Sequence, residues 1–317
     1  MKTALIFTVI TILFTFGCSE DFPDAGELGN ENQILAIKTE PPEVGIGDET
    51  LITPLVHWPQ GDENYLWFIC LPDKKDKTDN LSTCIIDMLE EQNGQVDDCG
   101  VNPDDRLCIL SHEKEPSYTV PDILWFSAST TTQYFYAMMI ASDQGDPLTE
   151  CDSAWREMIP DSKCLLSGKR IVYNPGVITN RNPEINGLVF GEETADPTGI
   201  YTISGGKAVF HVDFDLSTVD EFIPDVENTL RLQVSFFTTC GTIDPWRESI
   251  VCSSTGDPET AGCEALEMEL KADVSGECVI HTVLIDKNYF GEDADVIEGT
   301  DPYVPGLTWL SQRILIQ

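Results

Sequence analysis

Cysteine is the residue type whose number and spacing carry the clearest chemistry in this chain. The sequence contains 11 cysteines. Zinc sites use CxxC pairs, or cysteine and histidine at short spacing, and neither pattern occurs. We therefore expect disulfides, which form in oxidising compartments. The ten cysteines expected to form them are Cys70, Cys84, Cys99, Cys108, Cys151 and Cys164 in the first half, and Cys240, Cys252, Cys263 and Cys278 in the second.

An even number of cysteines in each half predicts that the disulfides close within each half. Many connectivities satisfy this condition, and spacing alone leaves them open. As local pairs we predict Cys151 with Cys164, and Cys240 with Cys252.

The first residues have the pattern of a secretory signal. Lys2 precedes an apolar run over residues 4–16, which is 13 residues long. A helix that crosses a bilayer needs about 20 residues, so the run is short for a transmembrane span. We predict a signal peptide over residues 1–17.

The remaining cysteine, Cys18, directly follows this run. The sequence TFGC at residues 15–18 resembles the lipobox of bacterial lipoproteins, although a leucine usually stands where this chain has Thr15. The resemblance implies a lipid on Cys18 and, because Ser19 follows it, a place in the outer membrane. An ordinary signal peptide with an incidental cysteine is the alternative. Setting Cys18 aside leaves an even number of cysteines, which favours the lipid anchor.

Residues that could perform catalysis form no recognisable motif. The sequence lacks GxSxG, HExxH, P-loop and GxGxxG patterns. With 55 acidic residues, no carboxylate pair can be singled out as a glycosidase site. His211 and His281 fall within strand patterns, where histidines usually have structural roles. We predict that the chain is not an enzyme and uses no cofactor.

Tryptophans are the candidate contacts for a sugar ligand. Trp155 and Trp246 lie in loops bounded by cysteines, so they could be exposed and stack on a glycan. Trp67, Trp125 and Trp309 fall in apolar strand patterns, and we expect them in the core.

Acidic residues dominate the charge, and the formal net charge is −37. Nucleic acids and anionic lipid surfaces require basic patches, so we predict no nucleic-acid partner. Carboxylates cluster at residues 97–98, 104–105 and 291–301, and calcium takes six to eight oxygen ligands. The cluster at residues 291–301 lacks the order of acidic residues and glycine that defines an EF-hand calcium loop. We expect solvated acidic loops and no metal site, with calcium-dependent adhesion as an alternative.

Alternating apolar residues predict an all-β protein. Ala208, Phe210, Val212 and Phe214 point one way along a strand, and the run over residues 230–236 repeats the pattern. Further strands are expected at residues 34–37, 50–56, 65–70, 119–126, 133–141, 170–173, 279–285 and 307–316, and a weaker one at 264–272. One short helix is expected near residues 80–94, inside a cysteine-rich insertion.

The two halves share an order of strands and glycine turns, as a weak internal repeat would. We predict two tandem antiparallel β-sandwich domains. The predicted organisation is a signal peptide at 1–17, a lipid-anchored acidic tether at 18–33, a first sandwich at 34–178 with an insertion at 80–112, and a second sandwich at 179–317.

Three stretches resemble a known family. They are LAIKTEPPEV at residues 35–44, NPEI at residues 182–185, and the run at residues 232–239. They resemble uncharacterised outer-membrane lipoproteins of myxobacteria and related Gram-negative bacteria. The cysteine-rich insertion departs from that pattern. The resemblance implies immunoglobulin-like or fibronectin-III-like domains and no known activity.

These observations lead to one functional hypothesis and its alternatives. The leading hypothesis is a non-enzymatic, lipid-anchored envelope protein that offers loops or sheet edges to other proteins. Binding of glycan or peptidoglycan through Trp155 and Trp246 is the alternative from a different class. The expected partners are the membrane, through the lipid on Cys18, and an envelope protein or glycan.

Overall fold

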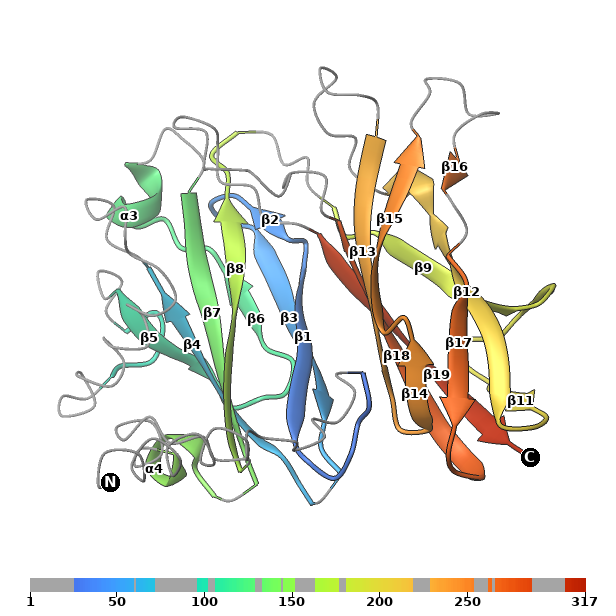
Figure 1. Ribbon diagram of the computed structural model, residues 1–317. Helices are drawn as coiled ribbons and strands as arrows, with labels where there is room; N and C mark the ends of the chain where they lie inside the picture. The colour runs from blue at the N-terminus through green and yellow to red at the C-terminus, as the bar shows by residue number, and fades with distance from the viewer. Residues whose placement is uncertain are drawn as a thin grey trace, which may run out of the picture.

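The described part of the chain is all-β, as predicted (Figure 1). A computed structural model describes residues 26–59, 61–71, 96–101, 106–128, 133–143, 145–151, 163–176, 181–218, 229–253, 262–263, 266–286 and 306–317. Strands between residues 33 and 173 build one pair of sheets, and strands between residues 184 and 316 build another. We call these the N-terminal and the C-terminal sheet pair.

The N-terminal pair consists of a three-stranded and a five-stranded sheet. The three-stranded sheet has the order β1 (Gln33–Glu40), β3 (Glu49–His57), β6 (Ser117–Thr119). The five-stranded sheet has the order β2 (Glu43–Val44), β8 (Cys164–Tyr173), β7 (Gln133–Ser142), β4 (Asn64–Cys70), β5 (Leu107–Ser111).

The C-terminal pair consists of a five-stranded and a six-stranded sheet. The five-stranded sheet has the order β10 (Glu193–Thr194), β9 (Glu184–Phe190), β12 (Lys207–Asp215), β17 (Met268–Ala272), β14 (Gly241–Asp244). The six-stranded sheet has the order β11 (Ile200–Ile203), β19 (Leu307–Ile316), β18 (Gly276–Asp286), β13 (Thr229–Thr238), β15 (Arg247–Ser253), β16 (Gly262–Cys263).

Each sheet pair encloses a core of alternating residues, which is the packing of a β-sandwich. In the N-terminal pair, Ile37 and Ile52 from one sheet meet Trp67 and Phe135 from the other. Trp67 is fully buried, as predicted, and its indole nitrogen donates to the carbonyl oxygen of Glu113 at 3.0 Å. A buried indole N–H needs such a partner, since leaving it unpaired would cost free energy.

The C-terminal core confirms the alternation read from the sequence. Phe210 and Val212 of β12 are buried, whereas Val209, which precedes Phe210, is half exposed. The ring of Phe210 packs edge-on against that of Phe236 from the facing sheet, with centroids 5.4 Å apart. The strand predicted weakly at residues 264–272 is confirmed for β17, whose Met268 and Leu270 are buried.

The prediction of purely antiparallel sheets is wrong at two sheet margins. β2 runs parallel to β8, and β11 runs parallel to β19. The chain leaves the first sheet after β1 in the N-terminal pair, and after β9 and β10 in the C-terminal pair. In both places it then joins the edge of the facing sheet beside the last strand of the pair. The glycine turn that follows has a positive φ in both halves, at Gly47 and Gly205, where a side chain would be strained.

Helices within the described ranges are single turns. They are α3 (Leu124–Ser127), α4 (Pro147–Glu150) and the 3₁₀ turn η1 (Leu216–Thr218). α3 replaces the end of the strand predicted at residues 119–126, where Pro121 cannot donate to a ladder. The helix predicted near residues 80–94 lies outside the described residues. Among the described residues, no helix combines the length and the apolar character needed to span a membrane.

The two sheet pairs meet along β1 and β3 on one side and β18 and β19 on the other (Figure 1). Ala36, Leu55, Val283 and Leu307 are buried there. The ammonium nitrogen of Lys38 lies 5.2 Å from the centroid of the Trp309 ring, within the range of a cation–π contact. Trp309 therefore packs at this junction and not within either core.

Asn182 joins the connection between the two pairs to both sides of the junction. Its amide nitrogen donates to the carbonyl oxygen of Thr39 at 2.7 Å. Its side-chain oxygen accepts from the backbone N–H of Leu307 at 2.9 Å. One side chain thus binds β1 and the start of β19 together.

The cysteines form disulfides within each sheet pair. Cys99 bonds Cys108, and Cys151 bonds Cys164 as predicted. The predicted pair of Cys240 with Cys252 is wrong, because Cys240 bonds Cys278 with a Cα–Cα distance of 5.5 Å. Cys240 follows β13, and Cys278 lies on the neighbouring strand β18.

The remaining cysteines are two that lie opposite one another in the C-terminal pair and two in the N-terminal half of the chain. The backbones of Cys252 and Cys263 are register partners across β15 and β16. Cys70 is disulfide-bonded, and Cys84 lies outside the described residues.

Removing the disulfide between Cys240 and Cys278 is expected to destabilise the protein more than removing the one between Cys99 and Cys108. The first closes 38 residues and the second 9. Loop entropy alone predicts losses of about 4 and about 2.6 kcal/mol. Denaturant unfolding of the two double Cys→Ala variants measures both losses. Equal losses would show that loop length does not govern the effect.

Candidate functional site

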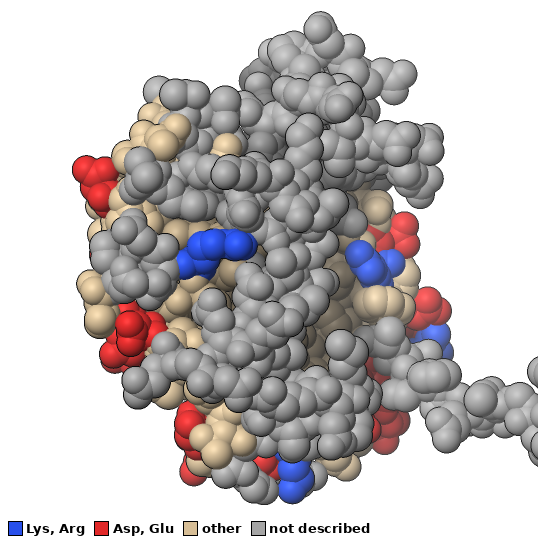
Figure 2. Space-filling view, turned by 90° about the vertical axis from the view of Figure 1, so that its left-hand side faces the viewer, with Lys and Arg blue, Asp and Glu red and all other residues tan. Residues whose placement is uncertain are grey.

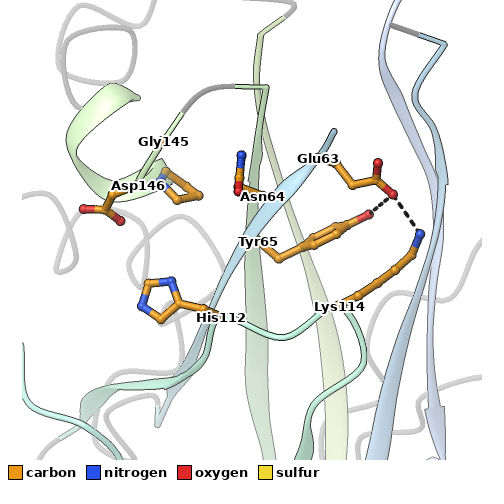
Figure 3. A pocket seen from close by; sticks show the side chains of 8 residues that line it. Glu63, Asn64, Tyr65, His112, Lys114, Gly145 and Asp146 are labelled. Carbon is orange, nitrogen blue, oxygen red and sulfur yellow. Dashed lines mark hydrogen bonds and ion pairs between the residues drawn. The ribbon is translucent and has the colours of Figure 1, made fainter. Parts of the chain in front are cut away.

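A shallow surface pocket of about 390 Å³ lies where three segments of the N-terminal pair meet (Figure 3). The segments are the start of β4, the stretch after β5, and the entry to α4. β4 is the strand between β5 and β7, so its start lies beside the stretches that adjoin both neighbours. The lining residues are Glu63, Asn64, Tyr65, His112, Lys114, Gly145, Asp146 and Pro147.

Glu63 is the hub of the polar contacts in this pocket (Figure 3). The same carboxylate oxygen accepts from the Lys114 ammonium at 2.9 Å and from the Tyr65 hydroxyl at 3.1 Å. Lys114 also lies 5.7 Å from the centroid of the Tyr65 ring. A carboxylate bound by a cation and a phenol on one oxygen is fixed in orientation.

The electrostatics of the cluster keep Glu63 charged and Tyr65 neutral. Burial raises the pKa of Glu63, but the hydrogen bond and charge of Lys114, with a backbone N–H and Tyr65, lower that pKa overall. Burial, and then the negative charge of Glu63, raise the pKa of the Tyr65 phenol. The pair therefore holds a charge-assisted hydrogen bond across the physiological pH range.

The opposite wall of the pocket is built on α4. The Asp146 carboxylate caps this turn by accepting from the backbone N–H of Leu148 and from the Thr149 hydroxyl. His112 and Asn64 are exposed at the rim. The pocket thus offers an imidazole, an amide and two engaged carboxylates, which are groups that can hydrogen-bond to a polar ligand.

Of the predicted lipid and glycan residues, the structure describes only Trp246, which does not line this pocket. Cys18 and Trp155 lie outside the described residues. Trp246 is half-buried, and its ring lies 6.5 Å from that of Phe237, centroid to centroid. Its Cβ atom backs directly onto Gly26. Trp246 is therefore a packing residue near the junction, which does not favour its predicted stacking on a glycan.

Acidic residues on the described surface do not converge. Of the predicted acidic clusters only Asp97 and Asp98 are described, and both are exposed. The described residues contain no group of three or more His, Cys, Asp or Glu side chains arranged to hold a metal ion. Figure 2 shows acidic and basic side chains interspersed on the described part of one face.

Two histidines face one another across the junction. His281 of β18 is half-buried, and its Nδ1 atom lies 2.8 Å from the Ser311 hydroxyl. His57 lies at the end of β3. Burial, with the positive charge of His57, lowers the pKa of His281 to about 4.

Comparisons with known proteins leave the family open. No family model matches the chain, and no curated protein matches it. The C-terminal domain of the Streptococcus pyogenes antigen I/II-family protein AspA aligns with 89% of this chain and 98% of its own, at 6% identity and a TM-score of 0.21. Three N-terminal domains of the bacteriophage RB49 highly immunogenic outer capsid protein align over the same shares, at 7% identity and a TM-score of 0.17. Similarity this low supports no argument about fold or function.

Replacing Lys114 with methionine is expected to raise the pKa of Glu63, because the donor and positive charge that lower it are lost. Glu63 contributes stability above its unfolded pKa, and that contribution is lost as the pH falls through its lower folded pKa. The variant should therefore lose less stability on acidification. Carboxyl NMR titration measures the pKa. Lys207→Met, which removes a distant exposed pair with Glu269, is the matched control and should leave Glu63 unchanged.

Replacing His281 with glutamine is expected to flatten the stability of the protein between pH 6.5 and 4. The folded pKa of about 4 lies below the ordinary value of 6.5. The unfolded chain therefore takes up the proton first, and wild-type stability falls as the pH drops through this window. Denaturant unfolding across the window tests this, with His112→Gln at an exposed position as control. Parallel profiles for wild type and His281→Gln would contradict the assignment.

Proposed function

We propose that the chain is a non-enzymatic, lipid-anchored protein of the outer membrane that presents two Ig-like β-sandwiches to other macromolecules. The observation that carries the proposal is a disulfide-bonded, all-β body that follows a signal-like run and Cys18. Disulfides persist in oxidising compartments, which agrees with export. A lipid on Cys18 would then keep the exported body at the envelope.

The strand order supports the Ig-like part of the proposal. In Ig folds the strands A, B and E share one sheet, and G, F and C share the other. β1-β3-β6 and β9-β12-β17 occupy the A-B-E places. β8-β7-β4 and β19-β18-β13 occupy the G-F-C places, and β2 and β11 lie beside the last strand in each pair. The same order twice along one chain agrees with tandem domains.

The distribution of strands supports the proposed domain boundary near residues 178–179. β8 ends the N-terminal sheet pair at Tyr173, and β9 starts the C-terminal pair at Glu184. The described sheets do not exchange strands across this boundary. Each pair also encloses its own core.

The contacts in the surface pocket support a recognition role. Glu63 accepts from Lys114 and Tyr65 through one oxygen, and Asp146 caps α4. Both carboxylates thereby hold the loops around the pocket in place, as the support of a recognition surface would.

The intact mass of the native, membrane-extracted protein tests this proposal. We expect the mass of residues 18–317 plus acyl chains, because lipidation accompanies removal of the signal. Ten alkylations should appear only after reduction, since ten cysteines remain besides Cys18. Cys18→Ser is the control and should release an unacylated protein from the membrane fraction. An unacylated wild-type mass would refute the anchor.

A further inference from the structure

A short segment just before β1 binds the far sheet pair. The backbone N–H of Leu28 donates to the carbonyl oxygen of Thr238 at 2.7 Å, and the N–H of Thr238 donates to the carbonyl oxygen of Gly26 at 2.8 Å. Glu27 and Thr238 thereby form a parallel bridge at the end of β13. The Leu28 side chain is 5% exposed. We call residues 26–29 the strap.

The strap fits its place tightly at one end. A Cβ atom on Gly26 would lie 2.7 Å from the carbonyl oxygen of Phe236 and 2.8 Å from the Cβ atom of Trp246. Real Cβ atoms do not approach this closely, so Gly26 must be glycine for the strap to seat. A Cβ atom on Gly29 would meet nothing within 4 Å.

The other end of the strap reaches the N-terminal pair. The carbonyl oxygen of Gly29 lies 2.9 Å from Nε2 of His57, at the end of β3. The chain then turns into β1, and Figure 1 shows this dark-blue stretch between the two sheet pairs. The strap therefore lies at the junction and contacts both pairs before the first strand begins.

The position of the strap shortens the distance that any anchor on Cys18 can span. Gly26 is eight residues after Cys18, and Gln33, where β1 begins, is 15 residues after it. An extended chain spans at most about 3.6 Å per residue, which gives about 29 Å to Gly26 and about 54 Å to Gln33. A seated strap thus halves the reach that the predicted tether of residues 18–33 would otherwise have.

We infer that the strap fastens the lipidated arm to the C-terminal sheet pair, and so holds the junction beside the lipid headgroup surface. This inference rests on the proposed lipid on Cys18. The protein is then attached at the junction between its two sheet pairs. A force on the lipid would act first on the end of β13, where the strap binds.

Hydrogen exchange tests whether the strap is seated, and this test does not depend on the lipid. In the full chain, the amides of Leu28 and Thr238 should be protected in wild type and in Gly29→Ala. Gly26→Val should lose that protection while the amides of β12 and β18 keep theirs. If Gly26→Val does not fold, Leu28→Ala removes the buried side chain and serves instead. Protection that survives in the folded variants would overturn the strap.

Neutron reflectometry of the lipidated protein on a supported bilayer tests the distance. The gap between the headgroups and the protein layer should stay within about 29 Å for wild type and Gly29→Ala. It should widen, by up to about 25 Å, in Gly26→Val. An equal gap in all three proteins overturns the inference. A wild-type protein without acyl chains refutes the proposed anchor, whereas the hydrogen-exchange result would still stand.

Discussion

Two of the sheets, the three-stranded and the six-stranded one, carry apolar side chains on the face that points away from their own core. The need to cover these outer faces determines how the rest of the molecule is arranged. An antiparallel sheet can leave one face to water. Here the six-stranded sheet carries Val283, Ile285 and Trp309 on its outer face, and β1 and β3 bring Ala36 and Leu55 against them. Burial of these side chains packs the two sheet pairs against one another. Asn182, Lys38 and the strap then find their partners at the edges of that contact.

The features that the sequence revealed are those that repeat along one strand. Alternation over β12 identified its buried residues, because side chains on a strand point to opposite faces. The uninterrupted apolar run of β4 is typical of a strand buried on both faces, and Leu66 and Phe68 pack away from the sandwich core that holds Trp67. The pair of Cys151 with Cys164 was predicted from its short spacing, a criterion that gave the wrong partner for Cys240.

The features that the sequence concealed depend on neighbours that are distant in the chain. Nothing local places Cys278 beside Cys240, because that contact follows from the pairing of β13 with β18. The pocket joins Glu63, Lys114 and Asp146, none of which belongs to a motif. The strap lies in a stretch whose polar, glycine-containing composition indicated a spacer. Its binding comes from backbone hydrogen bonds, which composition does not encode.

The two short strands that run parallel to their neighbours have a consequence for crowding. β8 and β19 would each present a long open row of N–H and C=O groups, which is a template for pairing with another chain. β2 and β11 cover part of those rows, and being two and four residues long they leave little edge of their own. If the protein is confined to a membrane as proposed, its copies meet often in two dimensions, and these strands work against edge-to-edge aggregation.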